Sequence, residues 1–461
     1  MQDSATLGSP ILGQAPGGRL TAGLLLSAVV AALGGLLFGF DTAVISGTTD
    51  WLKSRFALTD FTLGFTVASA LIGTIVGSIT VGRPADSLGR RGILFILAIM
   101  YFVSALGCAL AWGWWSFMAF RFLGGLAVGG ASVVSPMYIA EISPARLRGR
   151  LVAITQFNIV LGILLAYLSN YVIGKLNLGP SECRWMFGVM AVPSAVFFFS
   201  LFLTPQSPRW LIALGRNDEA KIVFERCGTD PDSIDEEVRE IQASLDVQHH
   251  TLEEPFFCRK YLKPILLAVA IAAFNQLSGI NALIYYTPHI FKMAGSAADS
   301  ALFQSVIIGF TNLVFTMAAM SVIDHFGRRK LMLVGSFGYI LSLSAAAYAF
   351  YTNTGGRLLL ISLLVFIASH AFGQGAVIWV FISEIFPNRV RARGQALGSF
   401  THWIMAAAIS WTFPMIASKS GGHTFAFYAL CMVGQLFWVW LVMPETKGVS
   451  LEQIQKRLGI E

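Results

Sequence analysis

The sequence predicts an all-α integral membrane protein with twelve transmembrane helices in two pseudo-symmetric six-helix bundles. Three observations support this prediction. Of the 461 residues, 55% are hydrophobic and only 12% are charged, against about 25% charged residues in ordinary soluble domains. Long apolar stretches recur along the chain as six, a polar interval, and six more. Short motifs in the first set of six stretches recur in the second set, which indicates that one half of the chain is a duplicate of the other.

Each apolar stretch is long enough to cross a bilayer as a helix. The predicted spans lie at about 21–48, 62–82, 92–112, 114–140, 151–173 and 185–205, and then at 262–291, 301–323, 331–352, 357–383, 395–417 and 424–443. The first run is too long for the apolar core of a cleavable signal peptide, so we expect it to be retained as a span.

Three motifs occur once in each half, at an offset of about 240 residues. They are DSLGRR at 86–91 and DHFGRR at 324–329, EISP at 141–144 and EIFP at 384–387, and PQS at 205–207 and PET at 444–446. A duplicated membrane half is a common architecture of secondary transporters.

The basic residues predict the orientation. Most of the 32 Lys and Arg residues fall in alternate loops and in the two tails, and cytoplasmic loops carry such an excess. We therefore expect both termini in the cytoplasm and a multi-pass protein of the cell (inner) membrane. The expected parts are an N-terminal cytoplasmic tail (1–20), an N-terminal bundle (21–205), a cytoplasmic linker (206–260), a C-terminal bundle (261–444) and a C-terminal cytoplasmic tail (445–461).

The linker contains two charged, amphipathic segments, at 218–226 and 233–245, separated by Gly228 and Pro231. Their pattern favours short helices that tie the halves together. The alternative is an unstructured tether.

Several function classes lack support. The five cysteines are scattered without a CxxC pair or metal-ligand spacing, and GxxxxGK[ST] is absent, so no metal, cofactor or ATP-driven pump is expected. Ser, His and Asp residues do not follow a catalytic triad order, so an enzyme is not expected. The net charge of +7 reflects membrane topology, and no nucleic-acid partner is expected.

Two ionisable residues lie inside predicted spans. Asp41 is in the first span and Arg121 in the fourth, at compatible depths in the outer half of the membrane. A charge there is costly unless paired or hydrated. A buried carboxylate beside a guanidinium can exchange its proton when the partner moves, which predicts proton coupling. The alternative is a permanent ion pair that only holds the two spans together.

Polar side chains cluster in the seventh span. Asn275, Gln276 and Asn281 lie in an apolar segment that Gly279 and Pro288 interrupt, and irregular backbone at membrane depth survives where it lines a cavity. Amides donate and accept hydrogen bonds together, as polyols do. Other candidate contacts are Gln156, Asn312, Trp379, His402 and Trp403. Alternatively, single amides join helices and single Trp residues anchor at interfaces.

The repeated motifs predict a cytoplasmic gate, because their Arg residues can reach a Glu at the end of a nearby span. As surface pairs, each contributes little, which suits contacts that must break when that side opens. Positive-inside anchoring would explain the Arg residues but not the repeated Glu. The predicted gate residues are Asp86, Arg90, Arg91, Glu141 and Arg148 in the first half, and Asp324, Arg328, Arg329, Glu384 and Arg391 in the second.

Jointly, these residues resemble the sugar-porter family of the major facilitator superfamily, from about residue 21 to 455. The supporting strings are GFDTAVISG, GRPADSLGRRG, RFLGGLAVGG, PMYIAEISPARLRGR, PQSPRWL, QLSGINALIYY, DHFGRRK, SEIFPNRVRARG and PETKG. The pattern is most similar to bacterial proton-coupled pentose and hexose symporters, which are akin to facilitative glucose transporters.

The resemblance implies a central sugar site with alternating access. It places sugar contacts at Gln156, Gln276, Asn281, Asn312, Trp379 and Trp403, with Phe38, Tyr285 and Gly375 in the surrounding wall. It also implies that Asp41, where facilitative members carry Asn, marks proton coupling with Arg121 as its partner.

Three residues depart from the family pattern. Asn275 stands where Gln is usual, His402 where an amide usually precedes the Trp, and Gln206 where Glu is usual. The sequence thus predicts a proton-coupled monosaccharide symporter that works as a monomer in the lipid bilayer, with a facilitative uniporter or a non-transporting sugar sensor as alternatives. The sugar itself stays open.

Overall fold

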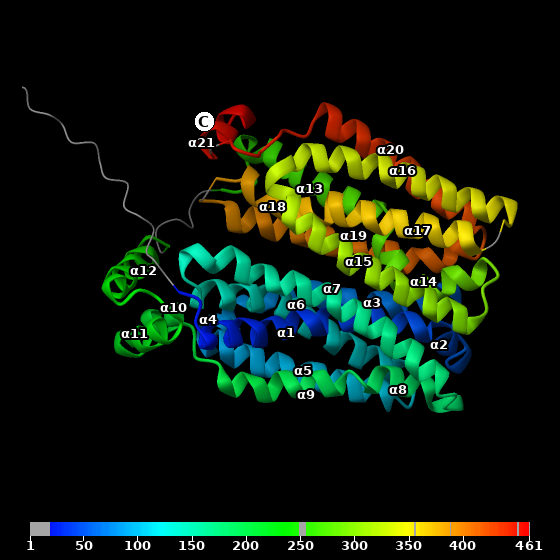
Figure 1. The fold of residues 1–461 in the computed structure, drawn as a ribbon, viewed down its shortest axis with the longest axis horizontal. Helices are drawn as coiled ribbons and strands as arrows, with labels where there is room; N and C mark the ends of the chain where they lie inside the picture. The colour runs from blue at the N-terminus through cyan, green and yellow to red at the C-terminus, as the bar shows by residue number, and fades with distance from the viewer. Residues whose placement is uncertain (1–18, 249–254, 355, 388, 450, 461) are drawn as a thin grey trace, which may run out of the picture.

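The computed structural model describes residues 19–248, 255–354, 356–387, 389–449 and 451–460, with the backbone alone at 245–248, 324, 451 and 452. Most of the predicted N-terminal tail therefore lies outside the described residues. Within them the chain forms helices and connecting turns, without a strand. Figure 1 shows two bundles: the N-terminal half from α1 to α9, and the C-terminal half from α13 to α20.

The predicted spans appear as twelve helical segments, several of which are interrupted. In the N-terminal half they are α1 (Ala22–Val44) with η1 (Ile45–Thr48) and α2 (Thr49–Arg55), α3 (Asp60–Thr80), α5 (Arg90–Ala109), α6 (Trp114–Ile142), α7 (Ala145–Lys175), and η2 (Gly179–Ser181) with α8 (Glu182–Gly188), α9 (Ala191–Ser200) and η3 (Leu201–Leu203). In the C-terminal half they are η5 (Arg259–Tyr261) with α13 (Leu262–Leu277) and α14 (Ile280–Met293), α15 (Ala298–Phe326), α16 (Arg328–Thr352), α17 (Gly356–His370) with η6 (Ala371–Gly375) and α18 (Ala376–Ile385), α19 (Arg391–Ala417), and α20 (Gly421–Leu441).

Eleven segments of the described chain are long and apolar enough to cross a membrane. The predicted span 395–417 is not among them, although α19 has 27 residues. Polar residues such as His402 lower its apolar character, and α19 packs against α3 and α13 inside the bundle. Its interior position explains why it can carry these residues.

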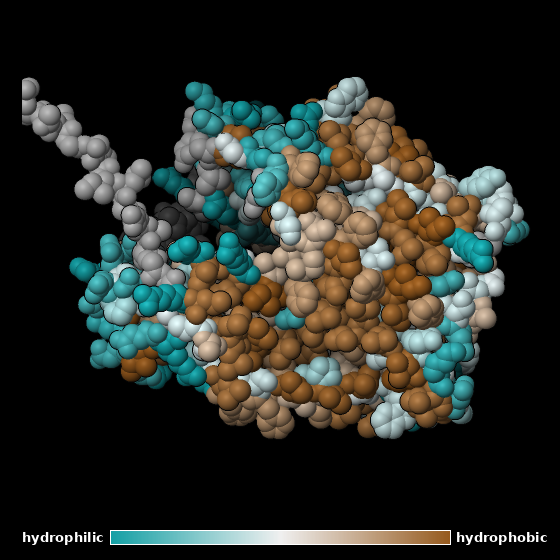
Figure 2. Space-filling model, in the orientation of Figure 1, coloured by the Kyte–Doolittle hydropathy of each residue, from teal (hydrophilic) through white to brown (hydrophobic). Residues whose placement is uncertain are grey.

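The lateral surface is apolar. Figure 2 shows a hydrophobic band over the helices and hydrophilic residues at the two ends. Large side chains such as Phe199, Leu341 and Trp440 are more than half exposed there. Such a surface is suited to lipid, because large contiguous apolar patches are rare on soluble monomers. The protein is a multi-pass membrane protein.

Inside the bundles, glycine lets helices approach closely. A Cβ at Gly39 of α1 would lie 1.9 Å from the Ile159 carbonyl oxygen of α7. Across the two halves, a Cβ at Gly64 of α3 would lie 2.0 Å from the Trp411 carbonyl oxygen of α19. Small residues at such crossings allow the van der Waals packing that joins helices in membranes.

The linker contains both expected helices, so it is not an unstructured tether. They are α11 (Asn217–Arg226) and α12 (Ile234–Gln248), next to α10 (Pro208–Ala213) and η4 (Pro231–Ser233). These helices lie at one end of the N-terminal bundle (Figure 1), where the Trp210 indole donates to the Asp86 carbonyl oxygen at 2.8 Å. We call this end of the molecule the linker end, and the opposite end the far end. The remaining short helices, α4 (Gly82–Leu88) and α21 (Leu451–Leu458), also lie at the linker end.

Candidate functional site

Two interrupted helices provide irregular backbone near the site, of which the sequence predicted the one at Gly279 and Pro288. Between α13 and α14, Gly279 adopts a left-handed conformation with φ of 85°, which glycine accepts at little cost. Within α14, Tyr286 has non-helical angles, two residues before Pro288. Between α17 and α18, η6 is a π-helical turn, a feature that often marks functional sites.

A cavity of about 140 Å³ lies between the halves at this level, with space for roughly five water molecules. The N-terminal half contributes α1 and α7, and the C-terminal half contributes the other walls. The lining residues are Phe38, Thr42, Gln156, Ile159, Val160, Ile163, Asn275, Gln276, Ile280, Asn281, Ile284, Tyr285, Asn312, Thr316, His370, Ala371, Gly375, His402 and Trp403. The structure thus brings together all but one of the residues predicted to contact sugar.

The exception is Trp379, which does not line the cavity. It lies in α18, one helical turn beyond Gly375 toward the linker end. Its ring packs on His402 with centroids 5.1 Å apart, and 41% of the residue is exposed. Trp379 thus packs on a cavity residue without lining the cavity itself, and its direct contact with sugar stays a prediction.

The predicted amide cluster forms one hydrogen-bonded chain. Asn281 Nδ2 donates to Gln276 Oε1 at 2.8 Å, and Gln276 Nε2 donates to Asn275 Oδ1 at 2.9 Å. The same Gln276 Nε2 lies 3.2 Å from His402 ring nitrogens. Because an amide nitrogen can only donate, the imidazole nitrogen that Gln276 bonds must accept.

This series of hydrogen bonds determines which amide donors and acceptors remain available to a ligand. Gln276 is fully buried and uses both ends of its amide on protein partners. Among the described contacts, the Asn281 Oδ1 acceptor and the Asn275 Nδ2 donor stay unused. On the facing wall, Phe38 and Trp403 lie with ring centroids 5.6 Å apart. The cavity therefore offers separate donors and acceptors beside aromatic faces, as recognition of a polyhydroxyl ring requires.

Sequence reasoning missed His370, which lines the cavity from the end of α17. Its Nδ1 lies 2.6 Å from the Tyr339 hydroxyl. The available signal was an ionisable residue within a predicted span, the same signal that identified Asp41. Thr42 and Thr316 also line the cavity without having been predicted.

Asp41 and Arg121 form the predicted ion pair. Arg121 Nη1 lies 2.7 Å from Asp41 Oδ1, with side chains that are 1% and 3% exposed. Arg121 Nε and Nη2 are buried without a hydrogen-bond partner in the described chain. Asp41 precedes the cavity-lining Thr42 directly. A buried guanidinium held by a single contact is sensitive to the charge of that partner, because little else compensates it.

At the linker end, the three repeated motifs of each half meet at one glutamate. In the N-terminal half, Glu141 accepts from Arg90 Nε at 3.0 Å and from the Ser207 hydroxyl. Arg90 also contacts Asp86 at 3.0 Å. In the C-terminal half, Glu384 accepts from Arg328 at 2.8 Å and from the Thr446 hydroxyl at 2.6 Å. The duplication is thus preserved as an Arg–Glu–hydroxyl cluster in each half.

The other predicted gate Arg residues do not contact the two glutamates in the described chain. Arg91 and Arg329 bond the backbone carbonyls of Leu201 and Val439, respectively. Arg148 Nε donates to the Ala140 carbonyl oxygen at 3.0 Å, so its predicted contact is made to the backbone before Glu141. Arg391 Nε is buried without a hydrogen-bond partner among the described residues. The side chain of Asp324 lies outside the described structure.

The two clusters differ at one position. Glu445 accepts from the Arg328 and Arg329 backbone amides at 3.0 and 3.1 Å, which caps the first turn of α16. Its counterpart Gln206 lies near Gly89 at the start of α5. There its Oε1 is buried without a partner in the described chain.

We therefore expect Gln206→Glu to stabilise the protein. A carboxylate at this helix N-terminus would cap α5 as Glu445 caps α16, and caps contribute about 1 kcal/mol. The midpoint of thermal unfolding in detergent should rise. The matched variant Glu445→Gln should lower it, and an unchanged or lower midpoint for Gln206→Glu would contradict the capping argument.

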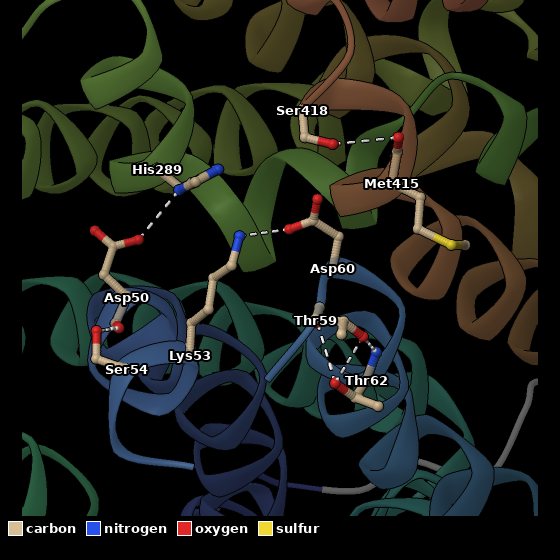
Figure 3. Close-up of polar contacts among 9 residues, drawn as sticks. All are labelled: Asp50, Lys53, Ser54, Thr59, Asp60, Thr62, His289, Met415 and Ser418. Carbon is tan, nitrogen blue, oxygen red and sulfur yellow. Dashed lines mark hydrogen bonds and ion pairs between the residues drawn. The ribbon is translucent and has the colours of Figure 1, made fainter. Parts of the chain in front are cut away.

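The two halves are joined at the far end. Asp50 of α2 lies 2.7 Å from Lys292 Nζ and 3.2 Å from His289 Nδ1 of α14, as Figure 3 shows for His289. Lys175 and Asp299 form a second inter-half pair at 2.7 Å. In the described chain, the hydrogen bonds and ion pairs between the halves lie at cavity level or beyond it toward the far end. The Lys53–Asp60 pair in Figure 3 lies within the N-terminal half.

The comparison with known proteins decides the family. A family model described as "Sugar (and other) transporter" matches residues 27–458. The chain belongs to this sugar transporter family. It is therefore a transporter and not an enzyme.

Three bacterial relatives of the sugar transporter family match over almost the whole chain. The D-xylose-proton symporter of Escherichia coli (strain K12) is 36% identical, covering 93% of this chain and 94% of the relative. The glucose transport protein of Synechocystis is 34% identical, covering 94% and 97%. The arabinose-proton symporter of Bacillus subtilis (strain 168) is 35% identical, covering 94% of each.

Solved structures show the same fold. The inward-open xylose transporter XylE of E. coli superposes with a TM-score of 0.84 at 35% identity, covering 93% of this chain and 98% of that one. XylE bound to 6-bromo-6-deoxy-D-glucose, a proton:xylose symporter of the major facilitator superfamily, gives 0.78 at 35% identity, covering 95% and 100%. The two-bundle architecture of this sugar transporter is thus the major facilitator fold.

Proposed function

We propose that the protein is a proton-coupled monosaccharide symporter that works by alternating access. The observation that carries this proposal is the buried Asp41–Arg121 pair, one residue from a cavity lined by amides and aromatic rings. The names of its relatives, which include xylose–proton and arabinose–proton symporters, support a monosaccharide and a proton as the two transported species.

In this proposal, Asp41 carries the proton. Protonation removes its negative charge and weakens its contact with Arg121, whose other two guanidinium nitrogens already lack partners. The guanidinium is then free to turn toward another acceptor, which changes the packing of α1 against α6. Sugar binding must favour one arrangement of the halves over the other, because a ligand shifts an equilibrium only by its differential affinity.

The finer topology is also a proposal. The linker end carries most of the basic loops, so we place this end and both termini in the cytoplasm. The membrane is then the cell (inner) membrane. The inter-half contacts toward the far end then describe a molecule closed to the outside. The higher TM-score to the inward-open transporter than to the sugar-bound one, 0.84 against 0.78, supports an inward-facing state.

The predicted gate role needs one adjustment. The Arg90–Glu141 and Arg328–Glu384 pairs each join helices of the same half, and both are formed while inter-half contacts lie toward the far end. We therefore propose that these pairs hold the linker-end loops of each half in shape, so that the two halves can meet there when that side closes. Breaking them is not required for opening in this arrangement.

The remaining partners follow from the same proposal. The lipid bilayer surrounds the apolar band, and the cavity and coupling pair are complete within one chain, which supports a functional monomer. No nucleic-acid partner is proposed, since the basic residues are accounted for by membrane topology.

The test is proton movement during sugar uptake. Purified protein in proteoliposomes containing a pH-sensitive dye should acidify the interior when D-xylose, L-arabinose or D-glucose is added outside. A competition panel against the labelled sugar would rank the substrates. Sugar entry without acidification would identify a uniporter, and the absence of entry for every monosaccharide in the panel would reject the proposal.

Removing the far-end carboxylate should shift the conformational equilibrium. Asp50→Asn loses its charge attraction to Lys292 and His289 across the halves, and pairs of this exposure contribute up to about 1 kcal/mol. We expect a roughly 2- to 5-fold larger far-end-open population. The measurement is labelling of Ser46→Cys, a residue buried at the far end, by an impermeant thiol reagent added outside.

The matched control is Lys53→Gln, because the Lys53–Asp60 pair joins helices of one half. It should leave the labelling rate unchanged once the signal of the native cysteines is subtracted. Equal rates in Asp50→Asn and the parent would show that this ion pair does not hold the far end closed.

A further inference from the structure

His370 occupies a distinctive position in the backbone. It is the last residue of α17, directly before the π-helical turn η6. A π-helical turn adds one residue to the helical repeat and so redirects the side chains beside it. The structure places His370 in the cavity lining together with Ala371 and Gly375 of this turn.

Helix α16 comes close enough to hold this imidazole. A Cβ at Gly335 would lie only 3.0 Å from Gly373 Cα, so the glycine contact allows α16 to pack directly on η6. One helical turn further along α16, Tyr339 is fully buried. Its hydroxyl lies 2.6 Å from His370 Nδ1, and its ring packs on Phe366 with centroids 5.3 Å apart.

This contact assigns the imidazole proton. In a neutral imidazole one nitrogen donates and the other accepts. A phenol is a stronger acid than an imidazole N–H, and an imidazole nitrogen is a stronger base than a phenol oxygen, so the Tyr339 hydroxyl donates to Nδ1. With the Tyr339 hydroxyl as the donor, Nδ1 accepts and the ring proton of His370 is on Nε2.

The Nε2 edge is left open by Gly375. A Cβ at Gly375 would lie 3.3 Å from His370 Cδ2 and 3.5 Å from Nε2, so a larger residue would cover this edge of the ring. Gly375 also lines the cavity. Among the described residues, His370 Nε2 has no hydrogen-bond partner. The amides of Asn275, Gln276 and Asn281, by contrast, are hydrogen-bonded to one another.

We propose that His370 is a sugar-orienting residue, whose Nε2–H donates a hydrogen bond to one oxygen of the bound monosaccharide while Tyr339 holds the ring in place. This inference rests on the proposed function, since it assumes a sugar in the cavity. Amides such as Asn275 and Asn281 can turn to donate or accept, but a fixed imidazole offers a donor in one direction only. It can therefore select the orientation of a single sugar hydroxyl.

The experiment compares sugar analogues on variants in proteoliposomes. The probes are D-xylose or D-glucose, whichever the wild-type protein takes up, with the complete set of its monodeoxy and monofluoro derivatives. His370→Phe keeps the planar ring and removes both nitrogens. It should raise the half-saturation concentration of the parent sugar about 2- to 12-fold, the loss of one hydrogen bond, and leave one deoxy derivative unaffected.

Two further results would follow from a donor at Nε2. The contacted sugar position is the one whose deoxy derivative binds equally well to the wild type and to His370→Phe. At this position the wild type should bind the fluoro derivative better than the deoxy derivative, because fluorine can accept a hydrogen bond but cannot donate one. His370→Gln, whose amide can replace the N–H, should restore most of the affinity. Tyr339→Phe should weaken binding at the same sugar position, and the control Ser362→Ala, on α17 away from the cavity, should change nothing.

Other outcomes overturn the inference. Equal weakening of every derivative by His370→Phe would show a packing role, and no weakening would show that His370 does not contact sugar. Equal losses for deoxy and fluoro derivatives would reject the donor assignment. If the wild-type protein transports no sugar, the proposed function itself fails, whereas sugar uptake without position-selective effects rejects the role of His370 alone.

Discussion

Asp41→Asn is expected to abolish uphill accumulation of sugar while leaving sugar exchange across the membrane. The amide cannot take up or release a proton at this site, so the proton gradient no longer drives the cycle. Asp41 is buried and bonded to Arg121 at 2.7 Å, and it does not line the cavity. The sugar site should therefore survive. The measurement is accumulation under an imposed pH gradient, beside counterflow of labelled sugar without a gradient.

Counterflow also serves as the folding control, because a misfolded protein cannot exchange sugar. This matters since the variant leaves Arg121 charged beside a neutral amide, and an uncompensated buried charge is destabilising. Glu219→Gln removes an exposed carboxylate of the linker and should leave both assays unchanged. Undiminished accumulation in Asp41→Asn would show that the ion pair only joins α1 to α6, and that coupling resides elsewhere.

Gln276→Ala is expected to have the largest effect on sugar affinity. Gln276 is fully buried in the cavity wall and orients Asn275, Asn281 and His402 through its two amide ends. Its removal frees all three side chains to rotate, in addition to any direct contact that it makes with sugar. A loss of two or three hydrogen bonds corresponds to about 2–3 kcal/mol, or a roughly 30- to 150-fold higher half-saturation concentration.

The control for this variant is Gln242→Ala, which removes an exposed amide in the linker and should not alter affinity. Asn281→Ala should fall between the two, because it removes one end of the chain and leaves Gln276 bonded to Asn275. An affinity loss in Asn281→Ala as large as in Gln276→Ala would contradict the central position of Gln276.

Much of the candidate site was predictable because single polar residues stand out in apolar segments. Asp41, Arg121 and the amides around Gly279 were identified in this way, and the structure brings each set together. The same argument should have included His370, which lies in an equally apolar segment. Trp379 was predicted from its residue type and from the family resemblance, neither of which shows that the turn of α18 places its ring on His402, outside the cavity lining.

The contacts within the site were less predictable. The repeated Arg and Glu motifs predicted an ion-pair cluster in each half. The third repeat, however, was only a sign of duplication until Ser207 and Thr446 were seen to donate to Glu141 and Glu384. Arg148 was predicted to complete the network around Glu141, and the structure gives it a backbone contact at Ala140 instead.

The sequence by itself determined the membrane-spanning fold, its duplication and the asymmetry between a coupling pair in the first half and an amide cluster in the second. These depend on hydropathy and on residue type, which are local properties of the chain. Only the tertiary structure decided the direction of the amide chain, the pairing of Tyr339 with His370 and the closure of the far end through Asp50. Each of these depends on how interrupted helices pack, because a kink at Gly279 or a π-helical turn at Ala371–Gly375 rotates every side chain that follows it.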